Sequence, residues 1–451
     1  MRVWTPDRIA RESGARLIAP APSDGGPERV TIDSRDAGPG SLFVGLPGAN
    51  VDGGAFAAQA LAAGAWGILA SPEHADQARA ASPGVLLAAE EPLAALQRLA
   101  TAWRNALDAE VVGITGSTGK TTTKDILFAL LAPARRTVAS RANFNTEIGL
   151  PLEILAAPAA TEVLVLEHAM RGAGQIAELA AISHPDVAVI VNIGPVHLEL
   201  LGSLEAIAAT KSELITALPA GGTAVIPAGE SLLEPHLRED VEVVRFGAGG
   251  DVRLERADSE HVVIAADGDS LELEFPFAQS HLRADLLAAV AAARAVGVTP
   301  SGRVEVALSP ARGQRTTLPG GVIVIDDCYN ANPMSMRAAL DDLATTARGA
   351  RTVAVLGDML ELGPDERDFH LQIGERADAI GLDLLVTVGP LAAAIGDRFD
   401  GESYAVADAG EAAALVPELL APGDVVLIKG SRGVGLELVT EALLASEDQW
   451  S

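Results

Sequence analysis

Short hydrophobic runs alternate with segments of helical periodicity along most of this chain. Between residues 106 and 308, runs rich in Val, Leu and Ile lie at 111–114, 163–166 and 187–193, and helical segments separate them. Strands of a parallel sheet that is covered by helices on both faces have nearly continuous apolar runs of this kind. The central part of the chain is therefore predicted to form a parallel sheet between layers of helices.

The end of this central region has a different pattern. Three segments in which apolar and polar residues alternate lie at 252–255, 262–264 and 271–275. A period of two is typical of strands with one face in water, so these segments predict short antiparallel strands. A helix is predicted at 282–296, and it completes the central region.

The regions on either side predict two further α/β units. Before residue 106, strand-like segments at 30–35 and 41–44 and an Ala-rich helix at 52–65 indicate a small unit. After residue 308, the pattern of a doubly wound, Rossmann-like domain appears. Its strands are predicted at 322–325, 353–356, 384–388 and 425–428, and its helices near 335–347, 368–380 and 410–420.

We therefore predict an α/β fold of three domains. Their predicted ranges are 1–105 for a small N-terminal α/β domain, 106–308 for a central parallel-sheet domain and 309–451 for a C-terminal Rossmann-like domain. The chain length of 451 residues agrees with this number, because domains usually contain roughly 100–200 residues.

The segment from Gly113 to Thr123 has the pattern of a phosphate-binding P-loop between a strand and a helix. Its glycines let backbone N–H groups approach phosphate oxygens, and the start of the helix adds positive partial charge. By this pattern Lys120 reaches the phosphates and Thr121 ligates Mg²⁺. The first glycine of the general motif is replaced by Ile114. The loop residues predicted to contact the nucleotide are Gly116, Ser117, Thr118, Gly119, Lys120, Thr121 and Thr122.

Lysine is rare in this protein. Of its 33 Lys and Arg residues only four are lysines, at 120, 124, 211 and 429, and the other 29 are arginines. A chain that uses Arg as its general cation retains Lys where a compact point charge or a reactive amine is needed. Lys120 has such a role in the P-loop. Lys124 is predicted to be a solvated helix residue, and Lys211 is a candidate for special chemistry.

Polar residues follow several of the predicted strands. Glu167 comes directly after one buried strand and His197 follows another, as the P-loop follows a third. Ligands bind at the carboxyl ends of parallel strands, and carboxylate oxygens are good Mg²⁺ ligands, so Glu167 is the best candidate for a metal-binding acid. Three polar loops, at 326–333, 357–359 and 429–432, follow strands of the last domain, and we expect them to face the P-loop.

The composition excludes some classes of partner and compartment. The formal net charge of −28 argues against nucleic acid or an anionic membrane as a partner. The single cysteine, Cys328, cannot form an internal disulfide and suits a reducing compartment. The N-terminus lacks the pattern of a signal peptide, and no apolar stretch approaches the ~18 residues of a membrane span. A cytoplasmic protein, without membrane insertion and monomeric, is expected.

Several of these motifs together resemble the Mur ligase superfamily. The P-loop from Thr115 to Thr122 is similar to that of the superfamily, in which an aliphatic residue commonly precedes the Thr. Further similar segments are Asn143–Pro151, Asn192–His197, Lys211–Glu213, Asp327–Pro333, Leu356–Gly363 and Lys429–Arg432. The last three are most similar to the branch that joins D-alanyl-D-alanine to a UDP-N-acetylmuramoyl-tripeptide, and Asp33–Arg35 extends the resemblance into the first domain.

The resemblance implies an ATP- and Mg²⁺-dependent ligase in which a substrate carboxylate becomes an acyl phosphate and an amine then attacks it. It implies catalytic roles for Lys120, His197 and Lys211 and places Thr121, Glu167, His197 and a carbamylated Lys211 at the metal ions. Further nucleotide contacts are implied for Asp285, Arg315, Asp327 and Tyr329. Contacts with the UDP-muramyl peptide and the dipeptide are implied for Ser34, Arg35, Asn145, Thr146, Lys429, Ser431 and Arg432.

Two positions depart from the pattern of the superfamily. Glu167-His168-Ala169 stands where Glu-Met-Gly is usual, which leaves the acid in place. Asp285 stands where an Asn that contacts adenine is usual, so this contact is an open question. The carbamate at Lys211 follows from the chemistry as well, because an ammonium beside Mg²⁺ would repel the metal, whereas a carbamate is a carboxylate-like anion.

Other functions share part of this pattern. A regulatory GTPase would have the P-loop, but its guanine-binding Asn-Lys-x-Asp motif is absent, since none of the four lysines follows an Asn. Another amide ligase of the same superfamily, acting on a folate or a muramyl dipeptide, is a closer alternative. A non-catalytic binding protein would not need the full set of polar loops.

Overall fold

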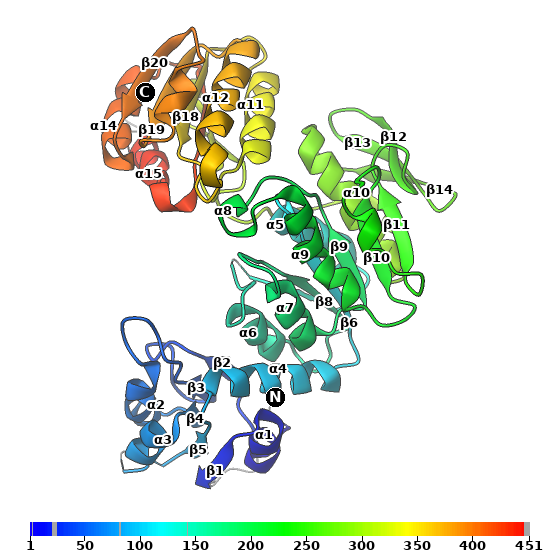
Figure 1. Ribbon diagram of the computed structural model, residues 1–451, viewed down its shortest axis with the longest axis vertical. Helices are drawn as coiled ribbons and strands as arrows, with labels where there is room; N and C mark the ends of the chain where they lie inside the picture. Colours follow the sequence, from blue (N-terminus) through cyan, green and yellow to red (C-terminus); the bar gives the residue numbers. More distant parts are fainter. Residues whose placement is uncertain (2, 20–24, 81–82, 142, 446–451) are drawn as a thin grey trace.

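The computed structural model describes residues 1, 3–19, 25–80, 83–141 and 143–445. In this part of the chain the strands form three sheets, and each sheet lies in a separate body with its own helices (Figure 1). The predicted α/β fold class is confirmed. The boundaries at 105/106 and 308/309 stay predictions, and the ranges that they define include residues outside the described part.

The first sheet has the strand order β1-β5-β4-β3-β2, in which β1 is antiparallel to β5 and the other neighbours are parallel. The strands are β1 (Arg16–Ala19), β2 (Arg29–Thr31), β3 (Ser41–Val44), β4 (Gly67–Ala70) and β5 (Val85–Ala88). The helices are α1 (Pro6–Ser13), α2 (Ala57–Ala62), α3 (Pro72–Ala78) and α4 (Pro92–Ala106).

Two predictions for this body are corrected. The strand predicted at 30–35 ends at Thr31, after which Thr31 and Asp33 form a local turn through the Thr31 hydroxyl. The helix predicted at 52–65 begins as a 3₁₀ turn, Gly53–Phe56, before α2. Adjacent glycines disfavour a regular α-helix. Position 54 requires glycine, because the Cβ of any other residue there would lie 2.3 Å from the Nδ1 atom of His74.

The central sheet has the order β15-β14-β13-β12-β11-β10-β9-β6-β8-β7. The predicted parallel part is confirmed from β7 to β12, and the predicted antiparallel strands are β12, β13 and β14. The strands are β6 (Glu110–Thr115), β7 (Thr137–Ala139), β8 (Val163–Glu167), β9 (Val187–Ile190), β10 (Thr223–Pro227), β11 (Glu242–Phe246), β12 (Val252–Ala257), β13 (His261–Ala266), β14 (Asp269–Glu274) and β15 (Gly302–Arg303).

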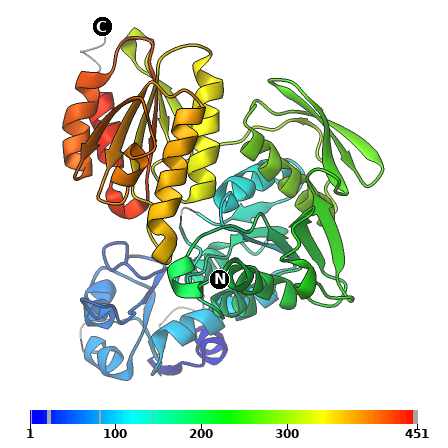
Figure 2. The same cartoon turned by 45° about the horizontal axis from the view of Figure 1, so that its top comes forward.

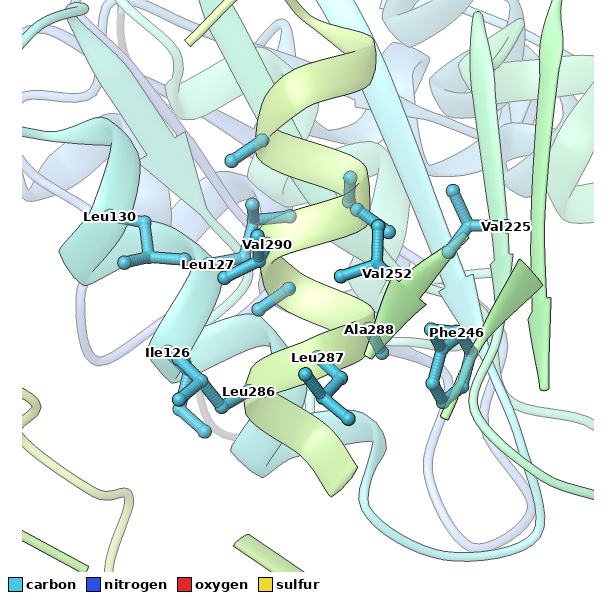
Figure 3. Close-up of a cluster of buried hydrophobic side chains, with 14 of the residues drawn as sticks. Ile126, Leu127, Leu130, Val225, Phe246, Val252, Leu286, Leu287, Ala288 and Val290 are labelled. Atoms are coloured by element: carbon cyan, nitrogen blue, oxygen red, sulfur yellow. The ribbon is translucent and has the colours of Figure 1, made fainter. Parts of the chain in front are cut away.

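The helices of the central body cover both faces of this sheet. They are α5 (Lys120–Leu131), α6 (Gly149–Ala156), α7 (Gln175–Ser183), α8 (Leu198–Leu201), α9 (Leu204–Thr216) and α10 (Ser280–Ala295). The Ala-rich helix α10 lies between α5 and β10–β12, and its Leu286, Leu287 and Val290 pack in one buried cluster with residues of these elements (Figure 3). This packing holds α5, and with it the P-loop, firmly against the sheet.

The third sheet has the order β16-β17-β21-β18-β19-β20, parallel except for the pair β16 and β17. Its strands are β16 (Gln314–Thr317), β17 (Ile323–Asp326), β18 (Thr352–Gly357), β19 (Leu384–Val388), β20 (Glu402–Val406) and β21 (Val425–Lys429). Its helices are α11 (Pro333–Ala347), α12 (Glu366–Ala379), α13 (Ala393–Gly396), α14 (Ala409–Leu419) and α15 (Glu437–Ala445).

The sequence analysis missed β16 and β20, which are the two edge strands of the third sheet. Most of their residues are exposed, so neither strand has the continuous apolar run by which the four inner strands were found. One of its contacts with the central body is made by the short helix α8, which lies near the start of α12 (Figure 2). In the described residues, no helix is long and apolar enough to cross a membrane.

Candidate active site

The P-loop connects β6 to α5 in the way that its sequence predicts. Gly119 has φ +75°, and a Cβ there would lie 2.5 Å from the carboxyl of Asp285, so only glycine fits this position. Helix α5 begins immediately after it, at Lys120, and the Lys120 ammonium donates to the carbonyl of Gly116 over 2.7 Å. The backbone N–H groups at this helix start form a phosphate-binding surface.

The segment after β9 holds the loop in shape. The side chain of Asn192 accepts a hydrogen bond from the Thr118 N–H over 2.9 Å, and Ser117 exchanges two hydrogen bonds of 2.9 Å with the Gly194 backbone. Because these contacts join the ends of two neighbouring strands, the loop is held by the sheet and does not depend on a bound nucleotide for its shape.

Glu167 ends β8 and lies beside the P-loop with only 1% of its surface exposed. One carboxylate oxygen accepts from the Thr121 hydroxyl over 3.2 Å and from the Asn145 amide over 3.4 Å. The other oxygen has no hydrogen-bond partner among the described residues. The oxygen that lies beside the Thr121 hydroxyl is in a position that suits a hard cation such as Mg²⁺.

Arg312 reaches the P-loop from the other side. Its guanidinium donates to the Thr121 hydroxyl over 3.2 Å and lies 3.8 Å from the ring centre of Tyr329. Burial lowers the pKa of Lys120 to about 8, the charge of Glu167 opposes this shift, and the charge of Arg312 adds to it. This concentration of positive charge is what a site for transferred phosphoryl groups requires.

Lys211 lies on α9 with 2% of its surface exposed, and no hydrogen bond or ion pair of its ammonium is found within the described residues. Burial, together with the charge of Lys120, lowers the pKa of Lys211 well below its usual value. The neutral amine that this favours is the form that reacts with CO₂. Two residues on, the carboxylate of Glu213 accepts from the Gly174 and Ala177 N–H groups and so caps the start of α7.

His197 follows β9 and has φ +53°, which is unusual for a residue other than glycine. Its Nδ1 lies 2.5 Å from a carboxylate oxygen of Glu361 in the third body. Burial lowers the pKa of His197, Glu361 opposes the shift, and the charges of Lys120 and Lys211 add to it. His197, Lys120 and Lys211 are thus close enough to influence one another electrostatically.

The loops of the third sheet converge as expected. The Lys429 ammonium donates to the Asp327 carboxylate over 2.6 Å and to the Asn330 carbonyl over 2.9 Å. The Ser431 hydroxyl accepts from the Leu360 N–H over 3.0 Å, and the Ser431 N–H donates to the Asp358 carbonyl over 3.0 Å. The loops after β17, β18 and β21 therefore form one connected polar surface.

No group of three or more His, Cys, Asp or Glu side chains that could hold a metal ion is present among the described residues. This does not conflict with a Mg²⁺ site, because Mg²⁺ usually binds one or two carboxylates and completes its coordination with phosphate oxygens and water. Two surface hollows, of about 680 and 560 Å³, lie elsewhere, between α1, α4 and α7 and along β12–β14.

Three models of one protein family match this chain. The "Mur ligase middle domain" matches residues 114–293, the "Mur ligase, glutamate ligase domain" matches 311–432, and the "Mur ligase family, catalytic domain" matches 28–107. A relative from Mycobacterium bovis, named UDP-N-acetylmuramoyl-tripeptide–D-alanyl-D-alanine ligase, is 38% identical over 98% of this chain and 97% of its own. The chain belongs to the Mur ligase family.

Relatives and solved structures with similar names match nearly the whole length of this Mur ligase. The ligase of the same name from Bacillus subtilis is 33% identical over 92% of this chain and 93% of its own. The crystal structure of MurF from Acinetobacter baumannii has a TM-score of 0.87 at 27% identity and covers 98% of this chain and 99% of its own. MurF ligase from Thermotoga maritima in complex with ADP has a TM-score of 0.81 at 30% identity, with 94% and 98% covered.

The structure of this Mur ligase places Arg315 away from the P-loop. Arg315 is on the edge strand β16, where it binds Asp342 over 2.6 Å and Thr346 over 2.8 Å. Arg312, three residues earlier, lies beside Thr121 instead, and the nucleotide contact implied for Arg315 stays a prediction. The two arginines stand three residues apart in one segment, and only their packing distinguishes them, so the sequence offered no signal for Arg312.

The prediction that Lys124 is a solvated helix residue is wrong. Its side chain is 4% exposed, and its ammonium donates to the Ser140 carbonyl over 2.8 Å and lies 2.9 Å from the Asp125 carboxylate. The rarity of lysine was a signal that could have identified this residue, because it applied to Lys124 as much as to Lys211.

The predicted substrate contacts lie on different elements. Asn145 lies at Glu167, to which it donates a hydrogen bond of 3.4 Å, and Thr146 lies beside it, just before α6. Ser34 and Arg35 follow β2 in the first body, where Arg35 forms an exposed ion pair with Asp33. Arg432, after β21, has its guanidinium 5.3 Å from the Tyr329 ring centre. Their substrate roles stay predictions.

Asp285 and His168, the two departures from the usual pattern, are both buried. Burial raises the pKa of Asp285 well above its usual value. Burial lowers the pKa of His168 to about 4, and the neutral ring lies 3.1 Å from the Leu166 carbonyl and 2.9 Å from the Ser183 hydroxyl.

Proposed function

We propose that this enzyme joins D-alanyl-D-alanine to UDP-N-acetylmuramoyl-tripeptide with hydrolysis of ATP to ADP and phosphate, in the synthesis of the peptidoglycan precursor. The observation that carries the proposal is the bridge of Arg312, which connects the P-loop hydroxyl of Thr121 to the polar loops of the third body. The names of the full-length relatives from Mycobacterium bovis and Bacillus subtilis support the same substrates.

The residues beside the P-loop fit ATP and Mg²⁺. ATP is supported by the ADP complex of the Thermotoga maritima relative and by the helix start at Lys120. For Mg²⁺, the support is the buried carboxylate of Glu167, one oxygen of which accepts from the Thr121 hydroxyl. Thr121 and Glu167 would hold one ion and His197 a second, and bound Mg²⁺ would neutralise charge on the phosphates.

The proposed reaction begins with the carboxylate of the tripeptide. This carboxylate attacks the γ-phosphorus of ATP, the bond to ADP breaks, and an acyl phosphate forms. The free amine of D-alanyl-D-alanine then attacks the acyl carbon, gives up a proton, and phosphate leaves from the tetrahedral intermediate. Two anions approach each other in the first step, so the cationic side chains of Lys120 and Arg312 stabilise its transition state.

The assay that tests this proposal supplies purified enzyme with ATP, Mg²⁺ and UDP-N-acetylmuramoyl-tripeptide, with and without D-alanyl-D-alanine. We expect phosphate release and a product whose mass is increased by the dipeptide only when all components are present. Product formation with a single amino acid on a muramyl dipeptide or a folate, and none with the dipeptide, would instead support another ligase of the same family.

We also propose that Lys211 is carbamylated in the active enzyme. The support is its complete burial without a partner beside the other cations of the site. Lys211→Ala should be nearly inactive and partly restored by short carboxylic acids. Lys211→Arg should be inactive without restoration, because a guanidinium stays protonated. Substantial activity of Lys211→Arg would contradict the carbamate.

We propose finally that the enzyme acts as a monomer in the cytoplasm. The support is its set of small, charged substrates and the location of all candidate site residues on one chain. Sedimentation velocity at the concentrations used in the assay should give a single species of about 46 kDa. A dimer that persists on dilution would contradict the monomer.

A further inference from the structure

Lys124 has no part in the proposed chemistry, yet it is buried directly below the P-loop. It lies one helical turn after Lys120 on α5, and its side chain is 4% exposed. Its ammonium is surrounded by three oxygen atoms, the Ser140 carbonyl at 2.8 Å, an Asp125 carboxylate oxygen at 2.9 Å and a Glu167 carboxylate oxygen at 3.8 Å. The last of these is the oxygen of Glu167 that lacks a hydrogen-bond partner.

The contacts of Lys124 fix Glu167 from two sides. Ser140, whose carbonyl accepts from Lys124, also accepts from the backbone N–H of Glu167 through its hydroxyl over 3.1 Å. The ammonium therefore holds both the segment next to the acid and, by its charge, the carboxylate itself.

Asp125 connects this cluster to the third body. One of its oxygens pairs with Lys124, and the other accepts a hydrogen bond of 2.8 Å from the backbone N–H of Ser309. Ser309 lies in the segment 308–314, which leads from the central body into β16. The side chain of Gln314 donates to the carbonyls of Leu308 and Ser309, so this segment is folded upon itself.

The same segment carries Arg312, whose guanidinium binds the Thr121 hydroxyl. The backbone N–H of Arg312 donates to the Gln314 side chain over 2.8 Å. The contacts thus form a closed circuit from Glu167 through Thr121 and Arg312 to the segment 308–314, and back through Asp125 and Lys124 to Glu167. The segment is also bound to the third body, because the Gly313 N–H donates to the Asp326 carbonyl and the Tyr329 N–H donates to the Ala311 carbonyl. A rotation of the third body that moves this segment therefore strains the circuit.

We propose that Lys124 and Asp125 form a hinge anchor, a pair of positioning residues that couples the orientation of the third body to the position of Glu167. The inference rests on the proposed role of Glu167 as a metal ligand. Lysine suits the position because a compact ammonium can satisfy three acceptors that surround it, whereas the planar guanidinium of Arg cannot. When the third body is in its productive orientation, the anchor holds Oε1 of Glu167 and leaves Oε2, beside the Thr121 hydroxyl, for Mg²⁺.

The test compares variants of the two residues in calorimetric binding of ADP at a series of Mg²⁺ concentrations. Lys124→Met keeps an unbranched side chain that is one atom shorter and removes its charge. We expect it to raise the Mg²⁺ concentration needed for half-maximal ADP binding roughly 10- to 100-fold, as for other residues that support metal ligands. Asp125→Ala should also raise this Mg²⁺ concentration, although Asp125 does not contact Glu167. Asp125→Asn retains an oxygen that can accept from Ser309, so it should raise the Mg²⁺ concentration less.

The coupling itself is measured by a double-mutant cycle and by small-angle scattering. The shifts of Lys124→Met and Asp125→Ala should be less than additive, because both variants break one circuit. Asp125→Ala alone should increase the radius of gyration of the ADP·Mg²⁺ complex. Arg351→Met is the matched control. It removes a cation that lies 2.9 Å from the carboxylate of Asp424, which is 2% exposed, and both residues are in the third body, away from the segment 308–314.

Two results would overturn the hinge anchor. One is an unchanged Mg²⁺ dependence in Lys124→Met together with a loss of thermal stability equal to that of Arg351→Met, since this would make Lys124 merely structural. The other is an Asp125→Ala variant with wild-type Mg²⁺ dependence and scattering. A failure of the proposed function is distinguishable, because the wild-type enzyme would then form no ligated product while the binding and scattering measurements could still be made.

Discussion

The two junctions between the bodies of this protein are built from different interactions. Between the first and central bodies, one continuous cluster of buried apolar side chains includes Trp4, Leu99 and Trp103 on one side and Leu150 and Leu179 on the other. Between the central and third bodies, none of the buried apolar clusters formed by the described residues is shared. This second junction is made of polar contacts, such as those of Arg312 with Thr121, Ser309 with Asp125, and His197 with Glu361.

The difference predicts which body moves. Apolar burial is lost entirely when a junction opens, so a shared hydrophobic core keeps two bodies together. Hydrogen bonds at an open junction are replaced by bonds to water, and each contributes only about 0.5–1.5 kcal/mol net. We therefore expect the first and central bodies to behave as one unit. We expect the third body to swing against them and to close when nucleotide and substrate bind.

The largest effect should come from breaking the apolar junction. Trp103 is 3% exposed, packs edge to face on Trp4 with ring centres 5.2 Å apart, and donates to the Ala157 carbonyl over 3.0 Å. Trp103→Ala should lower the free energy of unfolding by roughly 3–5 kcal/mol, the usual cost of such a cavity. Urea denaturation measures this, with Trp66→Ala as the control, since Trp66 is only partly buried and packs against this cluster from outside. Equal losses in both variants would contradict a special role for the shared core.

At the polar junction, loss of Arg312 should affect the rate and leave stability nearly unchanged. Arg312→Met removes the cation beside Thr121, and kcat should fall about 10²–10³-fold, as when one transition-state donor is lost. Lys120→Ala should cost roughly 10²-fold or more for the same reason. Arg315→Met is the control, and its kcat should stay within a few fold of wild type. The reverse order, with Arg315 the more important residue, would restore the assignment made from the sequence.

A smaller effect is expected from the contact between His197 and Glu361. Glu361→Gln removes the charge that pairs with the imidazole across the junction, and we expect a loss of roughly tenfold in kcat, the lower end for a residue that orients a metal-binding His. Scattering with a non-hydrolysable ATP analogue and the UDP-muramyl peptide should show a more open molecule than wild type. Glu199→Gln, an exposed neighbour on α8, should behave as wild type. Unchanged scattering and rate in Glu361→Gln would show that this contact does not hold the junction closed.

The smallest effect concerns pH and the loop that carries Glu361. His370 accepts from the Met359 N–H at Nε2 over 3.0 Å, and its Nδ1 lies 2.7 Å from the Glu366 carbonyl, so the ring is neutral. Burial lowers the pKa of His370 below its usual 6.5. As the pH falls, the imidazole of His370 is therefore protonated in the unfolded chain before it is protonated in the folded protein. The free energy of unfolding should decrease below about pH 6.5, by at most about 1.4 kcal/mol per pH unit. His370→Gln should flatten this dependence in denaturation curves between pH 4 and 7, and an equal slope in both proteins would contradict the assignment.

The sequence by itself determined the parts of this protein that depend on local pattern. Continuous apolar runs identified the inner strands β6, β8 and β9 of the central sheet and the four inner strands of the third sheet, because such strands are buried on both faces. The inner strands β4, β5 and β10 are equally buried but were not predicted. The P-loop was recognisable because few residue types can bring backbone N–H groups to a phosphate. Placement at strand ends assigned Glu167, His197 and the polar loops to one edge of their sheets, because the carboxyl ends of parallel strands share an edge. The edge strands β16 and β20 were missed because their residues are mostly exposed.

Only the tertiary structure decided which charged side chains meet. Arg312 and Arg315 stand in the same segment, and the direction of β16 alone sends one to Thr121 and the other to Asp342. Lys124 was expected in water because a Lys on a helix is usually solvated, whereas the packing of β7 and β8 against α5 buries it among three oxygens. Long side chains can reach in several directions at little cost, so their partners are set by the positions of elements distant in sequence, and a local pattern holds no record of those positions.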